Sequence, residues 1–206
     1  MKKQTIIFTA MIFLILNGIC FAGAPHQLGG FELGKYIADF KAMVRMQTAR
    51  AIHHQEYLHE LEIKETKGFK SGFIWIGNCL EPGRILRIKL KYDDSSKKFY
   101  NELLKRFKKR FGEPSEWRGD PFHIVIAWKW SFIDKKNNRI SLILQHNTKD
   151  EEEKIGNAVK LTMTNLIEKE RLCHEKRSSD SPRKAGKKKH VIKDLKASDW
   201  DRMIPQ

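Results

Sequence analysis

A short segment, residues 116–123, brings together several side chains that can hold a ligand. Arg118, Asp120 and His123 are able to bind a polar molecule, and Trp117 offers a flat face for stacking. The same residues also fit a structured loop, in which a glycine and a proline set the turn and Asp120 caps local backbone. We favour the structured loop and keep a ligand site at Trp117, Arg118, Asp120 and His123 as the alternative.

Cations recur at every second position between residues 86 and 92, with apolar residues between them. This is the pattern of a half-buried strand, because successive side chains of a strand point to opposite faces. In a second expected strand, Lys129 points away from an aromatic face. If both strands share one sheet, its open face is positive, which fits an anionic partner and equally fits ordinary solubility charge. This predicted anionic-partner surface consists of Arg87, Lys89, Lys91 and Lys129.

Motifs for catalysis or cofactor binding are not evident in the sequence. The histidines at 53, 54 and 59 with Glu56 do not follow the H-E-x-x-H order of a zinc helix, and surface histidines explain them better. Neither a G-x-S-x-G elbow nor a G-x-x-x-x-G-K phosphate loop occurs. We therefore expect no metal and no cofactor, and leave enzymatic activity open while leaning against it.

The first 22 residues have the three parts of a signal peptide. Lys2 and Lys3 precede an apolar run at 6–16, and small residues surround Ala22. This order predicts export with cleavage after Ala22. The apolar run is too short for a membrane-spanning helix, which needs about 20 apolar residues. We expect a periplasmic or secreted protein, with an uncleaved anchor as the alternative.

Cysteine content and charge follow from this prediction. Once Cys20 leaves with the signal peptide, Cys79 and Cys173 remain, and a pair of cysteines in an oxidising compartment predicts a disulfide. The whole chain carries 40 Lys and Arg against 25 Asp and Glu, a formal charge of +15. The expected partner is an acidic protein, an anionic lipid or an envelope component. Export argues against nucleic acid.

Hydrophobic periodicity predicts the elements that position these residues. We expect an α+β domain over 23–177, with helices packed on one face of an antiparallel sheet of about four to five strands. The composition of 178–206 predicts a disordered basic tail. Helices are expected at 31–46, 96–111 and 150–173, and strands at 57–63, 69–76, 86–92, 122–133 and 140–146.

Two short motifs carry a resemblance. The stop Phe111-Gly112-Glu113-Pro114 after a basic helix, and the opening Gly30-Phe31-Glu32-Leu33-Gly34, make residues 30–147 similar to small exported domains and lipoproteins of Gram-negative bacteria. The resemblance implies an exported α+β domain, and it transfers no residue role because most such domains have no assigned activity.

These observations favour a binding or interaction protein that uses its basic surface on an anionic partner. One alternative is an envelope enzyme or small-ligand-binding domain centred on residues 117–123. Nucleic-acid binding becomes a further alternative only if the signal peptide prediction fails.

Overall fold

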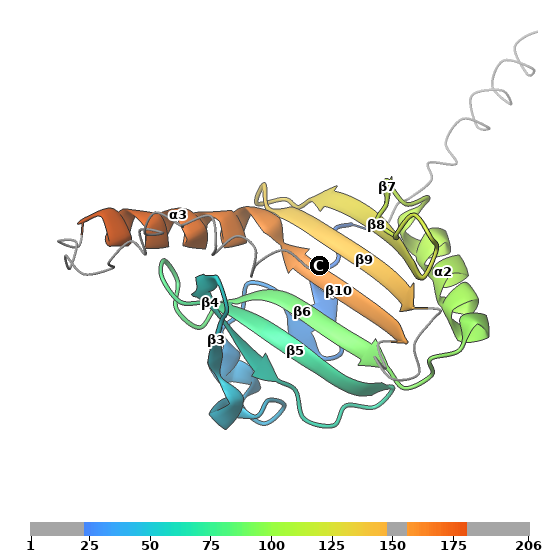
Figure 1. Ribbon diagram of the computed structural model, residues 1–206, viewed down its shortest axis with the longest axis horizontal. Coiled ribbons are helices and arrows are strands. Elements are labelled where there is room, and N and C mark those ends of the chain that lie inside the picture. Colours follow the sequence, from blue (N-terminus) through green and yellow to red (C-terminus); the bar gives the residue numbers. More distant parts are fainter. Residues whose placement is uncertain (1–22, 148–155, 181–206) are drawn as a thin grey trace, which may run out of the picture. The chain divides into compact units, whose positions relative to one another are not determined.

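A computed structural model describes residues 23–147 and 156–180. Within them, eight strands form one antiparallel sheet in the spatial order β3-β4-β5-β6-β10-β9-β8-β7 (Figure 1). A separate two-stranded ribbon is formed by β1 (Gln27–Leu28) and β2 (Phe31–Glu32). The strands of the large sheet are β3 (Arg50–Ile52), β4 (Gln55–Glu62), β5 (Phe69–Gly77), β6 (Ile85–Tyr92), β7 (Glu116–Trp117), β8 (Val125–Ile133), β9 (Arg139–Asn147) and β10 (Asn157–Met163).

Two α-helices, α2 (Lys97–Phe111) and α3 (Thr164–Asp180), complete the described part. The chain divides into two compact units, Met1–Glu175 and Lys176–Gln206. The sheet, α2 and the candidate site lie in the first unit. The predicted signal peptide at 1–22 lies outside the described residues, as does the predicted tail beyond residue 180.

The expected sheet of four to five strands with packed helices was wrong, since the described fold is mostly β with eight strands in its main sheet. The main error is at β10, which we expected to belong to a helix running to residue 173. Ala158 and Thr162 are buried on one face of β10, while Val159 and Leu161 are buried on the other. A strand with buried residues on both faces shows little polar alternation, so its sequence does not distinguish it from a buried helix.

The expected helix at 31–46 was also wrong. The segment contains β2 and the 3-10 turn η1 (Ile37–Phe40), and a second 3-10 turn, η2 (Met46–Thr48), follows it. Gly34 has a φ of 80°, which an α-helix does not allow. The apolar residues that suggested a helix are nonetheless in the core, because an irregular segment can bury them as well. They include Phe31, Leu33, Ile37 and Val44.

The remaining expected elements are present with small shifts at their ends. Helix α2 begins after Ser96, whose Oγ accepts a hydrogen bond from the Phe99 N–H at 3.2 Å, and ends at Gly112, whose φ is 79°. This fits the preference for a hydroxyl at the start of a helix and glycine at its end. Strand β8 starts at Val125 rather than at 122, so Phe122 is 83% exposed instead of facing the core.

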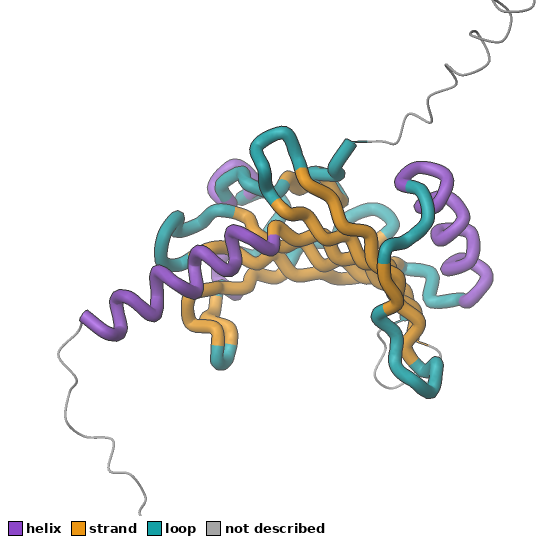
Figure 2. The backbone as a smooth tube through the Cα atoms, turned by 90° about the horizontal axis from the view of Figure 1, so that it is seen from above, coloured by secondary structure: helices purple, strands orange, loops and turns teal. Residues whose placement is uncertain are grey.

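The two faces of the sheet have different environments. Figure 2 shows a curved sheet with α2 and the N-terminal segment on its convex side, while no helix of the described residues covers the concave side, which we call the open side. Apolar side chains of the inner strands, such as Ile88, Leu144 and Leu161, join Tyr100 of α2 and Phe31 in one core on the covered side. The open side therefore presents the alternate residues of β5, β6, β10, β9 and β8.

Candidate functional site

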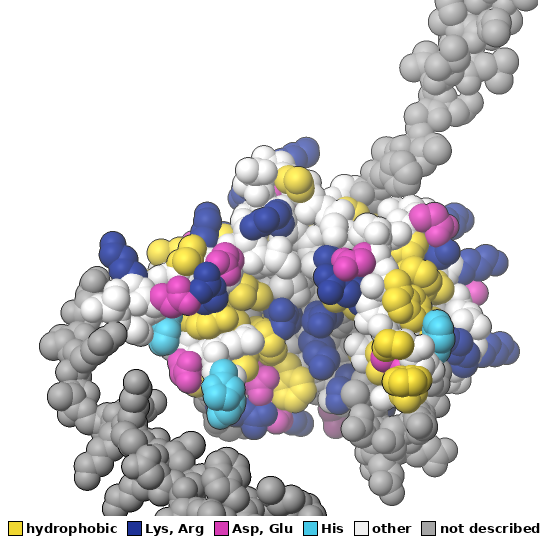
Figure 3. All heavy atoms as spheres, turned by 45° about the horizontal axis from the view of Figure 1, so that its top comes forward, with side chains coloured by type: hydrophobic (Ala, Val, Ile, Leu, Met, Phe, Trp, Pro, Cys, Tyr) yellow, Lys and Arg dark blue, Asp and Glu magenta, His cyan; other side chains and the backbone are white. Residues whose placement is uncertain are grey.

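Strand register places four cations on the open face of the sheet. In the β6–β10 pair, Lys89 lies directly opposite Lys160, and Arg87 lies opposite Thr162. Lys91 is on the same face, because it alternates with the core residue Leu90. We call Arg87, Lys89 and Lys160 the basic cluster. In Figure 3, Lys and Arg side chains gather in the middle of the molecule, between flanks that carry hydrophobic side chains.

The basic cluster is unusual in its electrostatics. Burial first, and then the charges of Arg87, Lys89 and Arg118, lower the pKa of Lys160 to about 8. Burial also lowers the pKa of Arg87 to about 10. The pKa of Lys89 is lowered by burial first, and then by Lys91 and Arg87. Because all three pKa values are lowered, the protein holds the three positive charges in an environment that disfavours the charged form.

Arg87 is held in place from two sides. Its Nε donates a hydrogen bond of 3.1 Å to the Thr162 Oγ1. Its guanidinium lies 3.8 Å from the ring centroid of Trp75, which is opposite it on β5. A stacked and hydrogen-bonded guanidinium is fixed in orientation, while its terminal N–H groups remain available as donors.

Within the described residues, no carboxylate makes an ion pair with the basic cluster. The nearest strand that carries acids is β4, where Glu60 lies opposite Trp75. Glu60 accepts from Arg50, with an N–O distance of 2.7 Å, although its charge still raises the pKa of Lys89 slightly against the larger opposing effects. Among residues 23–147 and 156–180, the cluster therefore has no bonded counter-charge.

Lys129, the fourth residue of the predicted surface, lies on the same face but in a different setting. It is opposite Ile143 of β9, and Ile143 is opposite Lys160, so one strand separates the two lysines. Lys129 Nζ is 3.0 Å from a carboxylate oxygen of Glu116, and the hydrogen bond from Lys129 lowers the pKa of Glu116. Lys129 thus has its own counter-ion, whereas the described part of the chain supplies none to the basic cluster.

Asp120 of the predicted ligand loop is engaged with the loop's own backbone. One of its carboxylate oxygens accepts from the N–H of Phe122 at 2.8 Å and of Ile124 at 3.2 Å, and the other accepts from Val125. These hydrogen bonds hold the pKa of Asp120 below its usual range. The arrangement is that of a carboxylate that shapes a turn.

The other loop residues contact nearby side chains. The Trp117 ring packs edge-on against Trp128, with 4.8 Å between centroids, and lies 5.4 Å from the His123 ring. The Arg118 Nε is 2.9 Å from a Glu116 carboxylate oxygen. This is the geometry of a structured loop.

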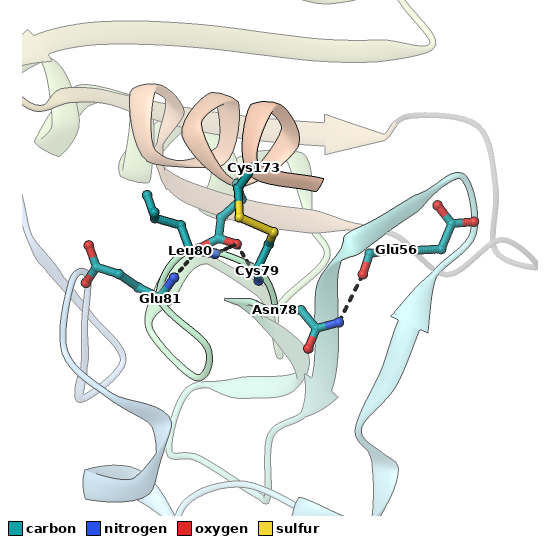
Figure 4. Close-up of a disulfide and its surroundings, with 7 residues drawn as sticks. Glu56, Asn78, Cys79, Leu80, Glu81 and Cys173 are labelled. Carbon is teal, nitrogen blue, oxygen red and sulfur yellow. Dashed lines mark hydrogen bonds between the residues drawn. A yellow bond between two sulfur atoms is a disulfide. The ribbon is translucent and has the colours of Figure 1, made fainter. Parts of the chain in front are cut away.

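The predicted disulfide between Cys79 and Cys173 is confirmed. It joins the loop after β5 to α3, with 6.0 Å between the two Cα atoms (Figure 4). Glu170 lies one helical turn before Cys173 and is only 2% exposed. Its carboxylate accepts from three consecutive backbone N–H groups of the loop, those of Cys79 at 2.7 Å, Leu80 at 2.9 Å and Glu81 at 2.8 Å.

Two important residues, Lys160 and Glu170, were missed from the sequence. Lys160 fell inside the wrongly expected helix, and its signal was a single lysine in an otherwise apolar run from 158 to 161. Glu170 was one of many acids in a polar helix. Its spacing of three residues before Cys173 could have indicated a shared helix face.

Neither a metal-ligating cluster nor a membrane-spanning helix is found in the part of the chain that the structure describes. Among the described residues, no group of three or more His, Cys, Asp or Glu side chains is placed to hold a metal ion. His53 and His54 occupy the β3–β4 turn with 3.7 Å between their ring centroids. Nor does any helix in the described part have the length and hydrophobicity needed to cross a membrane.

The fold and site of the described residues define an antiparallel β-sheet protein with one face covered by a helix and one cationic face that no described helix covers. Comparison with known proteins finds no matching family model, no matching curated protein and no matching solved structure. The function is therefore argued from the geometry.

Proposed function

We propose that this is an exported binding protein whose concave basic face takes up an anionic partner outside the cytoplasm. The observation that carries the proposal is the basic cluster, in which Lys89 and Lys160 lie directly opposite each other and no carboxylate of the described residues is bonded to them. Like charges in that position destabilise a sheet, and burial of the charges adds to the cost. An anionic partner would offset both penalties.

Export is supported by the disulfide and by the sequence of residues 1–22. Disulfides such as Cys79–Cys173 persist mainly in oxidising compartments, and the signal-peptide pattern precedes the described domain. The two arguments are independent, since one rests on tertiary structure and the other on the leader alone.

The curvature of the sheet restricts the form of the partner. The β3–β4 turn and the loop that follows β7 project on either side of the concave face (Figure 2). A flat bilayer would meet these projections before it reached the floor, where Arg87, Lys89 and Lys160 lie. We therefore commit to a slender polyanion, and an anionic bilayer or a folded acidic protein becomes an alternative outcome of the test.

The test measures binding of the mature protein to a labelled heparin oligosaccharide, at 50 mM and 300 mM salt. The site variant is Lys89→Gln with Lys160→Gln. The control, Lys105→Gln with Lys109→Gln, removes the same charge from exposed positions on α2. At low salt we expect the site variant to lose at least tenfold in affinity and the control less than threefold, because the partner contacts the cluster rather than sensing net charge.

Equal losses in the two variants would contradict the proposal and leave net charge as the explanation. Binding to phosphatidylglycerol vesicles but not to the oligosaccharide would contradict the slender partner. Melting curves of both variants establish that they are folded before the comparison is made.

A further inference from the structure

The chemistry of the concave floor selects among anions. Within the described residues, the side chains around the centre of the floor are rich in hydrogen-bond donors. Arg87 retains its terminal N–H groups, since only its Nε donates to Thr162. Lys89 and Lys160 each carry a full ammonium group. Ser141 lies opposite Thr162, so two hydroxyls border the cations on the same face.

Charge balance narrows the choice further. Three neighbouring cations are poorly neutralised by one carboxylate and well matched by a compact group with two negative charges. A phosphomonoester is dianionic above about pH 6 and presents three acceptor oxygens. A guanidinium fork recognises phosphate oxygens in pairs, and Arg87 is oriented for this by its stacking on Trp75.

We infer that Arg87, Lys89 and Lys160 form a binding site for a phosphomonoester group carried by a slender molecule. This inference rests on the proposed function and names the chemistry of its ligand. Arg87 supplies the directional contact, while Lys89 and Lys160 supply charge from opposite strands. Lys91 lies two residues beyond Lys89 on β6, opposite Ala158, and is outside the proposed site.

The site has a built-in dependence on pH. Lys160 binds the ligand when protonated, and its pKa of about 8 lies far below that of an ordinary lysine. Among the described residues, the charges that lower its pKa are those of Arg87, Lys89 and Arg118. The other charged groups on the same side of the sheet are Lys91 on β6, Lys129 on β8 with its partner Glu116 on β7, and Glu60 on β4. Since the phosphomonoester stays dianionic from pH 7.5 upward, deprotonation of Lys160 should weaken binding about tenfold between pH 7.5 and pH 9.

The experiment is calorimetric titration of the mature, disulfide-bonded protein with glycerol 2-phosphate and with malonate, a dianion made of two carboxylates. The variants are Lys160→Gln and Arg87→Lys, and Lys91→Gln is the matched control on the same face. We expect measurable binding of glycerol 2-phosphate and binding of malonate at least tenfold weaker. Lys160→Gln and Arg87→Lys should lose at least tenfold in phosphomonoester affinity, and Lys91→Gln less than threefold.

The outcomes separate this inference from the proposed function. If heparin binding depends on the cluster but glycerol 2-phosphate does not bind, the inference fails and the proposed function stands. Equal binding of malonate and phosphomonoester would likewise overturn it, since the site would then select charge alone. Loss of the pH dependence in Lys160→Gln would support the phosphomonoester site. Binding to phosphatidic acid vesicles but not to glycerol 2-phosphate would contradict a slender carrier. Failure of both heparin and phosphomonoester binding would end both proposals.

Discussion

Replacing Lys160 with methionine should stabilise the protein, although it removes a native side chain from the centre of the sheet. Methionine keeps most of the length of lysine and its flexibility, so it fills the same space between Lys89 and Ile143 without the charge. The folded state currently holds that charge against burial and against neighbouring cations. The gain comes from relief of these two penalties.

The magnitude follows from the pKa. A shift from 10.5 to about 8 corresponds to a penalty of up to about 3 kcal/mol at neutral pH, since one pKa unit is about 1.4 kcal/mol. Solvent relaxation around a partly exposed ammonium reduces this, so we expect a gain of about 1–2 kcal/mol in the free energy of unfolding. Because the folded pKa of Lys160 is the lower one, the unfolded chain binds more protons between pH 8 and pH 10.5. Stability of the wild type should therefore rise with pH in that window.

The assay is urea denaturation of wild type and Lys160→Met at pH 7.0 and pH 9.5. The wild type should gain stability at the higher pH, and the variant should gain less, because only other groups with a lowered pKa, such as Lys89, then contribute. The upper limit is set below pH 10 because burial raises the pKa of Tyr100 to about 12 and that of Tyr92 further, so that unfolding would become easier above their normal pKa.

Lys129→Met is the matched control, because Lys129 lies on the same face but is ion-paired with Glu116. Its loss should be neutral or destabilising by up to about 1 kcal/mol, as for other partly exposed ion pairs. A Lys160→Met variant less stable than wild type at pH 7, or a wild type without a rise toward pH 9.5, would refute the assignment of Lys160 as a buried charge held among cations.

Three further predictions concern covalent and local structure. Cys79 and Cys173 should resist thiol labelling until the protein is denatured and reduced, and Cys79→Ser with Cys173→Ser should lower the free energy of unfolding by about 4–5 kcal/mol, the loop-entropy value for this separation; rapid native labelling would contradict the bond. Glu170→Gln should be destabilising by about 1–3 kcal/mol, because one amide oxygen replaces two carboxylate oxygens that accept from three N–H groups; an unchanged urea midpoint would show that the capping is not needed. Intact-mass measurement of exported protein should give Gly23 as the first residue, and a mass that retains residues 1–22 would favour the anchor.

Local patterns in the sequence determined the elements with one solvated face. The alternation from 86 to 92 gave β6 and the facing of Arg87, Lys89 and Lys91, because a half-exposed strand shows its period directly. The stop after Phe111 marked the end of α2 at Gly112. The disulfide could be predicted because export left only two cysteines to pair.

Tertiary structure alone decided which distant residues become neighbours. Strand β10 has buried residues on both faces, so its sequence carried no clear period. Only its insertion between β6 and β9 brings Lys160 against Lys89. The same is true of Glu170, which meets the backbone of residues 79–81 across 89 to 91 positions of sequence. Cross-strand pairing and helix docking are set by the packing of the whole core, and a local pattern contains no information about the partner it will meet.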